Sequence, residues 1–351
     1  MIALSQGRAL SLFGAAAAVA CVLAIAAWLD PRAAAAGWLV GFTFWSQVMI
    51  GSLALLMIHR LTAGRWGEII APALIPAAAA IPWLLILAIP LVAAIPALYP
   101  WREHAARIKP DVLSYYLNSP FFVVRSVVAL AGWSALAILV PRATGAFGQL
   151  VAGLGLAFHG LMISVTSLDW YLSLEAPFTS SSFGASVATT QLIAAMAWAV
   201  VLAPEAESDQ NVGDLGALLL AFVLGITYID FMAVLVIWYG DLPREEIWFV
   251  ERDAWPWAVL AAAAFILSSV LPISLLMVSS VRASRTALRV LGAGVLIGLA
   301  LYDVYLIAPP FGIAALIPAL LALIAIGLTL TGWMLGGGAA LLGRTRLSHV
   351  H

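Results

Sequence analysis

Three ionisable side chains lie inside long apolar stretches of this sequence: His159, Asp230 and Asp303. An ionisable group at membrane depth is costly, so it usually has a partner or a function. A histidine can hydrogen-bond a quinone head group, and a carboxyl group in a low-dielectric environment can exchange protons near neutral pH. His159 is therefore a candidate for quinone binding or for a proton relay, and Asp230 and Asp303 are candidates for a proton relay.

Polar neighbours extend these two candidate sites. Arg125 lies near the end of an apolar stretch and would join the histidine at the quinone head group. Tyr228 and Tyr302 lie within two residues of the buried acids and would belong to the same proton relay. Gln47 and Gln191 lie in other apolar stretches, where their amides could continue a hydrogen-bonded path.

A structural interpretation stands beside each functional one. The histidine could be a neutral side chain bonded to a backbone carbonyl or a hydroxyl, and the two acids could be capped carboxyl groups that pin helices together. Arg125 is expected to pair with Asp169 or Glu175, because an unpaired arginine at this depth would have to reach the lipid head groups.

Composition identifies the class of protein. Of 351 residues, 64% are hydrophobic and 9% are charged, whereas a soluble domain has about 25% charged residues. The chain is therefore expected to be an integral membrane protein, and its net charge of −1 gives no indication of nucleic-acid binding. The single cysteine, Cys21, excludes an internal disulfide, a thiolate zinc site and a self-ligated iron–sulfur cluster. One histidine at membrane depth excludes a haem with two axial histidines, so we expect no metal site, no redox cofactor and no certain catalytic residue in this chain.

The apolar stretches predict an all-α polytopic membrane protein with ten transmembrane helices. The third stretch contains five prolines, so a kinked helix is expected there. The first stretch is interpreted as a retained helix rather than a cleaved signal peptide, because it is about long enough to span the membrane. The ten windows are approximately 9–28, 37–58, 69–96, 119–140, 146–167, 184–203, 215–239, 255–278, 287–307 and 313–335.

Basic residues predict the orientation. The side that holds the N-terminus carries nine arginines, and the opposite side carries six basic residues. This bias favours cytoplasmic N- and C-termini in a bacterial inner membrane. The three longest loops, at about 97–118, 168–183 and 240–254, would then face outward.

A weak internal repeat suggests how the helices are grouped. The segment Gly41–Ile50 and the segment Gly184–Ile193 each place a hydroxyl residue before a glutamine and then continue into an apolar run. The repeat indicates two four-helix bundles within a single membrane domain of residues 1–351. The bundles comprise helices two to five (about 37–168) and helices six to nine (about 184–307), with 9–28 and 313–335 as flanking helices.

The outward loops are rich in aromatic residues and charges. The segment SLDWYLSLEAPFTSSSFG, Ser167–Gly184, joins the two predicted bundles. Its aromatic residues Trp170, Tyr171 and Phe178 are expected to anchor it at the membrane interface, and residues 179–182 offer oxygens to cap the following helix. Together with the loop at 240–254, it is predicted to bind partner proteins through Asp169, Trp170, Glu175, Arg244 and Glu245.

Four segments together resemble the NrfD/PsrC-like family, specifically the second NrfD-like membrane subunit of alternative complex III, a quinol:electron-acceptor oxidoreductase. They are KPDVLSYYLNSPFFVVRSVVALAGW (109–133), the Ser167–Gly184 segment, DLGALLLAFVLGITYIDF (214–231) and VIWYGDLPREEIWFVERD (236–253). The resemblance covers about residues 40–310. Where the family has a polar serine–glutamine pair in helix seven, this chain has Met232 and Ala233, with Asp230 close by.

The resemblance implies a hetero-oligomeric respiratory complex. Its partners would be an iron–sulfur protein, a multihaem cytochrome c and a paralogous NrfD-like subunit, with a terminal oxidase as a further partner beside the membrane lipids. Haem c and iron–sulfur clusters would belong to those partners, and this chain would bind no redox cofactor directly. The paralogous NrfD-like subunit would be the better candidate for the quinol site, with quinone or quinol binding by this chain as the open alternative. The subunit would support quinol oxidation, proton release and docking of periplasmic subunits.

Two other functions fit the same composition. A proton-coupled secondary transporter would share the ten helices, the repeat and the buried acids, although its usual broken midplane helices are lacking apart from the proline-rich third helix. A purely structural membrane anchor would need neither a quinone site nor a proton path.

Overall fold

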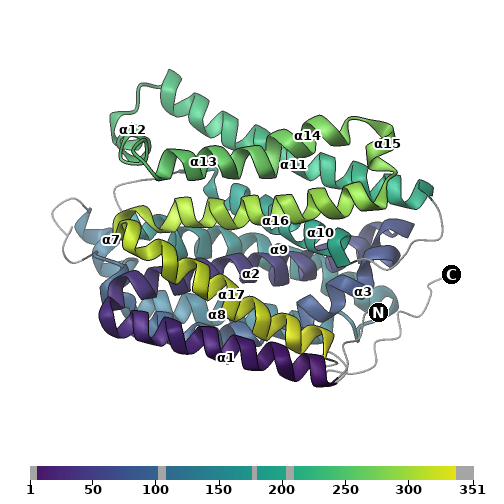
Figure 1. Ribbon diagram of the computed structural model, residues 1–351, viewed down its shortest axis with the longest axis horizontal. Coiled ribbons are helices and arrows are strands. Elements are labelled where there is room, and N and C mark those ends of the chain that lie inside the picture. The colour runs from purple at the N-terminus through teal and green to yellow at the C-terminus, as the bar shows by residue number, and fades with distance from the viewer. Residues whose placement is uncertain (1–5, 102–107, 176–179, 203–208, 337–351) are drawn as a thin grey trace.

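The computed structural model describes residues 6–101, 108–175, 180–202 and 209–336. These residues form helices and turns, with no strand among them, so the predicted all-α polytopic fold is confirmed. Within the described ranges, nine single helices are long and apolar enough to cross a membrane, or ten crossings if one bent pair is counted as a span. The long helices run roughly parallel to one another (Figure 1).

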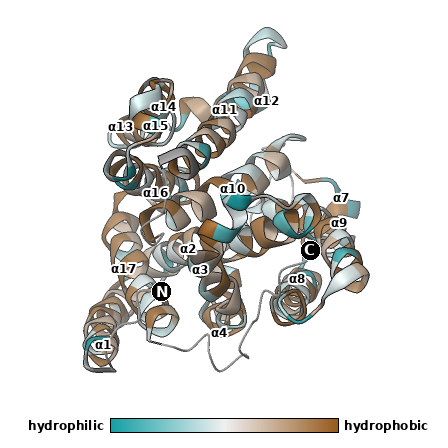
Figure 2. Cartoon of the chain, turned by 90° about the vertical axis from the view of Figure 1, so that its right-hand side faces the viewer, coloured by the Kyte–Doolittle hydropathy of each residue, from teal (hydrophilic) through white to brown (hydrophobic). Residues whose placement is uncertain are grey.

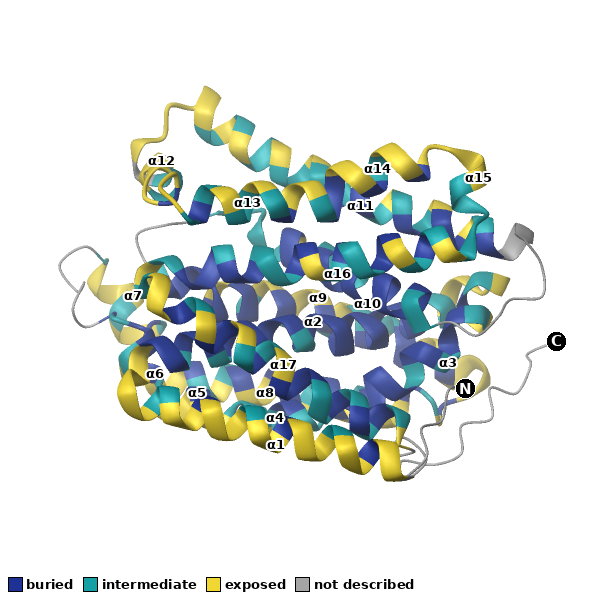
Figure 3. Ribbon diagram, viewed as in Figure 1, coloured by how far each residue is buried: buried dark blue, intermediate teal, exposed yellow. Residues whose placement is uncertain are grey.

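The predicted first bundle consists of α2 (Pro31–Thr62), α3 (Arg65–Ala79) with the short helices that follow it, α8 (Ser119–Leu139) and α9 (Gly145–Trp170). The first of these, α2, begins sharply because the Asp30 side chain accepts a hydrogen bond from the backbone N–H of Ala33 and Pro31 occupies the first helical turn. Its middle is buried almost continuously, so α2 is the centre of the molecule (Figure 3).

The proline-rich third span is broken, as predicted. The helical axis bends by 44° between Arg65–Ala79 and Trp83–Ala93. The short helices α4 (Trp83–Leu87), α5 (Ile89–Ala93) and α6 (Ile95–Leu98) follow, and α7 (Pro110–Tyr115) precedes α8. Because proline supplies no N–H, such a chain needs other donors, and the Trp38 indole N–H donates to the Leu87 carbonyl at 2.8 Å.

The second bundle contains α10 (Phe183–Leu202), α11 (Asp209–Tyr239), a composite eighth span and α16 (Arg285–Ile307). The composite span comprises α13 (Trp257–Phe265), the π-helical segment η3 (Ile266–Val270) and α14 (Leu271–Leu276). The short helices α12 (Pro243–Val250) and α15 (Ser279–Arg282) lie at opposite ends of this span (Figure 1).

Two helices flank the bundles as predicted. They are α1 (Gln6–Leu29) and α17 (Leu316–Leu335), which pack against each other and against α2, and two short turns, η4 (Pro309–Phe311) and η5 (Ile313–Ala315), precede α17. We call the end of the molecule with α7, α12 and the turn η2 (Leu172–Glu175) the α12 end, and the other the α15 end. The described helix α1 begins, and α17 finishes, at the α15 end (Figure 1).

The two bundles meet mainly where α2 packs on α10. At Gly51 the backbones approach so closely that a Cβ atom there would lie 1.9 Å from the Gln191 carbonyl oxygen. The two glutamines of the weak repeat, Gln47 and Gln191, are both buried at this interface.

Candidate functional site

A buried polar cluster joins the two bundles. The Nε2 of Gln47 in α2 donates to both carboxyl oxygens of Asp303 in α16, at 2.9 and 3.1 Å, and to the Tyr171 hydroxyl at 2.9 Å. The Tyr171 hydroxyl lies 3.4 Å from the Asp303 Oδ1 and donates to it. We call Gln47, Tyr171 and Asp303 the bridge cluster. Asp303 has 0% of its surface exposed, so its carboxyl group depends on these neutral donors in place of solvent.

One polar atom of the bridge cluster has no protein partner. The Gln47 Oε1 is buried and accepts no hydrogen bond among the described residues. A small cavity of about 10 Å³ touches the cluster and is also lined by Ser186, Thr190 and Tyr302. A space of this size holds about one water molecule.

Asp230 lies beside the bridge cluster, in a larger cavity of the second bundle. The Ser186 hydroxyl of α10 donates to the Asp230 Oδ1 at 2.8 Å. The cavity measures about 410 Å³ and is lined by residues of α10, α11, α12, α13, η3 and α16. We call it the Asp230 cavity.

The Asp230 cavity and the small cavity beside the bridge cluster share part of their lining. Ser186, Thr190 and Tyr302 line both the Asp230 cavity and the small cavity next to Asp303. Hydroxyl groups can both accept and donate a proton, so these three side chains are candidates for a polar connection between the two acids. The predicted relay residues Asp230, Asp303 and Tyr302 are thus brought together.

The fourth predicted relay residue, Tyr228, lies elsewhere. Its side chain is 65% exposed and lines a different cavity of about 860 Å³ between α7, η2, α10 and α11. Within the described residues it is therefore separated from the bridge cluster.

The π-helical turn shapes one wall of the Asp230 cavity. It places Ser268 and Ser269 in the lining, and both side chains are buried. Helix α16 approaches closely at Gly298, where a Cβ atom would lie 2.7 Å from the Ser268 nitrogen. Single π-helical turns inside α-helices frequently occur at functional sites.

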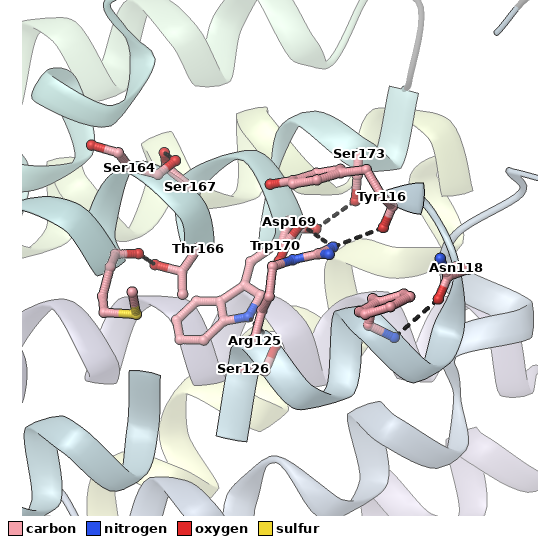
Figure 4. A network of polar contacts seen from close by, with 12 residues as sticks. Tyr116, Asn118, Arg125, Ser126, Ser164, Thr166, Ser167, Asp169, Trp170 and Ser173 are labelled. Carbon is pink, nitrogen blue, oxygen red and sulfur yellow. Dashed lines mark hydrogen bonds and ion pairs between the residues drawn. The ribbon is translucent and has the colours of Figure 1, made fainter. Parts of the chain in front are cut away.

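Arg125 pairs with Asp169, which confirms one of the two pairings expected from the sequence (Figure 4). Its Nε and Nη2 donate to the two carboxylate oxygens at 2.7 and 2.9 Å, and Nη2 also donates to the Tyr116 carbonyl at 3.0 Å. The guanidinium lies 3.9 Å from the centre of the Tyr116 ring. Burial, with the Asp169 charge as a second cause, raises the pKa of Tyr116 from 10.0 to about 12.

The two predicted quinone ligands are both in the first bundle, and neither lines the cavities described above. His159 is buried, with its ring centre 6.0 Å from that of Trp133, and its Nδ1 has no hydrogen-bond partner among the described residues. The linings described for the 860 Å³ cavity and the Asp230 cavity include neither His159 nor Arg125.

The segment that joins the bundles is held by ion pairs and aromatic packing. The Trp170 indole N–H donates to the Ser126 hydroxyl at 3.0 Å, and Trp170 and Tyr171 are buried. Their predicted role as interfacial anchors is therefore wrong, because both rings pack inside the protein. Phe178 and Thr179 lie outside the described residues.

The predicted docking residues occupy different environments. Asp169 and Trp170 are buried, whereas Glu175 is partly exposed and pairs with Arg252. Glu245 lines the 860 Å³ cavity, and Arg244 lies in α12 with its side chain outside the described residues.

Arg252 is a buried residue whose environment the sequence did not indicate. It lies in the connection after α12, has 1% of its surface exposed, and its guanidinium lies 3.7 Å from the centre of the Trp248 ring. The guanidinium also donates to the Trp248 carbonyl at 3.1 Å. The only signals in the sequence were its position in an aromatic, charged loop and the nearby Glu175.

Comparison with protein-family models and with curated protein sequences finds no match for this chain. The helices and their apolar surfaces define a multi-pass, all-helical integral membrane protein. The described residues contain no group of three or more His, Cys, Asp or Glu side chains that could hold a metal ion.

Proposed function

We propose that this chain is a membrane subunit of a quinol-oxidising respiratory complex of the alternative complex III type. In this role it handles protons and holds partner subunits, and it carries no redox cofactor of its own. The electrons pass to iron–sulfur and haem centres in those partners. The proposal places the chain in a bacterial inner membrane, with the α12 end facing the periplasm.

The observation that carries the proposal is the polar connection between Asp230 and Asp303. Two carboxyl groups joined by hydroxyl-bearing side chains, deep in an otherwise apolar helical protein, are the groups that proton transfer requires. Oxidation of one quinol releases two protons and two electrons. The carboxylates accept the protons in turn, and the partner redox centres accept the electrons.

The resemblance of the loop segments supplies the second support. The structure places two of those segments against each other at the α12 end, where Glu175 of the first pairs with Arg252 of the second. The same end carries the exposed side chains of Tyr115, Trp238 and Tyr239. These features suit a surface that binds periplasmic partner subunits.

Purification from native membranes tests the proposal. A tagged copy of the full chain, solubilised in mild detergent, should bring down subunits with c-type haem absorbance and iron–sulfur signals in electron paramagnetic resonance. Deleting the gene should abolish electron transfer from quinol to the acceptor of that complex. A chain that purifies alone, as a secondary transporter would, contradicts the proposal.

A further inference from the structure

We infer that the Asp230 cavity binds the head group of a lipid-soluble quinol. This inference rests on the proposed function and locates its substrate in the second bundle, away from His159 and Arg125. The geometry of the cavity, its hydrogen-bonding character and its opening each point to this ligand.

The size and composition of the cavity suit a small amphiphilic ring. Its volume of about 410 Å³ falls within the range of small-molecule sites, about 300–1,000 Å³. Its walls are mostly apolar and include the aromatic rings of Phe231, Trp248 and Phe265. Its polar lining includes Asp230, the Ser186 hydroxyl that donates to it, and the buried side chains of Thr190, Ser268 and Ser269.

Several polar groups of the cavity are available as hydrogen-bond acceptors. The Ser186 hydroxyl donates to Asp230, the Thr190 hydroxyl to the Ser186 carbonyl at 2.9 Å, and the Ser268 hydroxyl to the Ala264 carbonyl at 2.8 Å. Because these protons are already engaged, the three oxygens offer lone pairs to a ligand. A quinol has two O–H donors, which these oxygens and the Asp230 carboxyl group can accept.

The charge of the lining excludes a different class of lipid. None of the described lining residues is a lysine or an arginine, and Asp230 is the one acid among them. A phosphate head group would have no cation to bind and would face a carboxyl group. The site is therefore suited to an uncharged head group.

The cavity opens toward lipid. Phe231 of α11 and Phe265 of α13 line it and yet are 61% and 52% exposed. From Thr227 to Tyr239, α11 has no buried residue, and this half of the helix stands away from the helices around α2 (Figure 2 and Figure 3). A ligand dissolved in the bilayer can thus enter between α11 and α13 without crossing the aqueous phase.

The cavity leads to a proton acceptor beyond the ligand. Ser186, Thr190 and Tyr302 connect it with Asp303. A quinol O–H that donates to Asp230 would therefore release its proton onto a path that leads to the bridge cluster, while its electrons go to a redox centre of a partner subunit.

Binding of the quinol analogue 2-heptyl-4-hydroxyquinoline N-oxide to the purified complex, followed by quenching of its fluorescence, tests the inference. The substitutions Asp230→Leu and Ser268→Val should each raise its Kd by about tenfold or more, since each removes a hydrogen-bond acceptor from the site. Ser134→Val is the matched control. Ser134 is equally buried, and its hydroxyl likewise donates to a carbonyl four residues earlier, in α8.

Photolabelling of the unmodified complex with an azido-quinol keeps the test independent of folding of the variants. Labelled peptides should contain Phe231 or Phe265. Labelling confined to α8 and α9, or an unchanged Kd in both folded variants, overturns the inference. The complex could purify with its redox subunits and oxidise quinol, yet show neither the expected rise in Kd nor labelling at Phe231 or Phe265. In that case the proposed function stands and only the location of the quinol site is wrong. If the chain purifies alone, the same titration and labelling on that chain still decide the site.

Discussion

Gln47 and Asp303, which are 256 residues apart in the sequence, are hydrogen-bonded across the interface of the two bundles at 2.9 and 3.1 Å. The side-chain amide of Gln47 is therefore the main hydrogen-bond donor to the Asp303 carboxyl group, which is not exposed to solvent. Tyr171, from the segment between the bundles, completes the contact. A single buried cluster therefore ties together both bundles and the segment that connects them.

Removing one member of the Arg125–Asp169 pair should destabilise the protein. Arg125→Gln leaves a buried carboxylate without its cation, and we expect the free energy of unfolding to fall by about 3 kcal/mol. Unfolding by dodecyl sulfate in mixed micelles measures this change. Arg65→Gln, at an exposed arginine of α3, should have almost no effect, and equal losses for both variants would contradict the structural role of the pair.

Adding a methyl group at Gly51 should separate the bundles. Gly51→Ala places a Cβ atom 1.9 Å from the Gln191 carbonyl oxygen, a backbone atom that cannot move aside without shifting α10. We expect a loss of about 2 kcal/mol or more in stability. In contrast, a Cβ atom at Gly153 of α9 would meet nothing within 4 Å, so Gly153→Ala should be neutral or slightly stabilising. Thermal unfolding of both variants in detergent compares them directly.

Lysine should not replace Arg252. The guanidinium packs on the Trp248 ring and binds Glu175 through two nitrogens, a geometry that an ammonium group does not reproduce. Arg252→Lys should destabilise the α12 end by about 2 kcal/mol. Limited chymotrypsin digestion should therefore cut faster between α11 and α13 than in the unsubstituted protein. An unchanged cleavage rate there would show that the ion pair does not hold α12 in place.

Tyr116 should make stability depend on pH in alkaline solution. Its pKa is raised from 10.0 to about 12 in the folded protein, so the unfolded chain loses this proton first as the pH rises. The free energy of unfolding therefore decreases as the pH rises from about 10 to about 12. Below about pH 10 this tyrosine is protonated in both states and does not make stability depend on pH. The decrease in the free energy of unfolding over this pH range should be smaller in Tyr116→Phe and unchanged in Tyr115→Phe. Chemical unfolding at a series of pH values measures it.

The sequence predicted the architecture well because hydropathy alone determines which segments span the membrane. The proline-rich third span is bent as expected. Arg125 pairs with Asp169, one of the two acids predicted for it, because so apolar a chain offers few charged partners. Trp170 and Tyr171 were placed wrongly at the interface. Aromatic residues near a span end suit both the membrane surface and a buried packing site, and only tertiary structure distinguishes the two.

The internal arrangement of the candidate site could not be predicted. Gln47 and Asp303 each lie in an apolar run, and no local pattern indicates that they meet. The π-helical turn that brings Ser268 and Ser269 into the Asp230 cavity depends on the close approach of α16 at Gly298, which is a property of two helices together. Likewise, Arg252 lies in a loop, and its guanidinium contacts Trp248, Glu175 and Tyr305, which belong to three separate segments of the chain.

Quinol turnover and proton release in the Asp303→Asn variant of the intact complex test the proposed proton path most directly. The substitution keeps the size of the side chain and removes its capacity to accept a proton, so both rates should fall together by about a hundredfold. Glu68→Gln, at an exposed acid of α3, is the control and should leave both rates unchanged. Unchanged quinol turnover and proton release in a folded Asp303→Asn complex would contradict the proton path proposed for this chain.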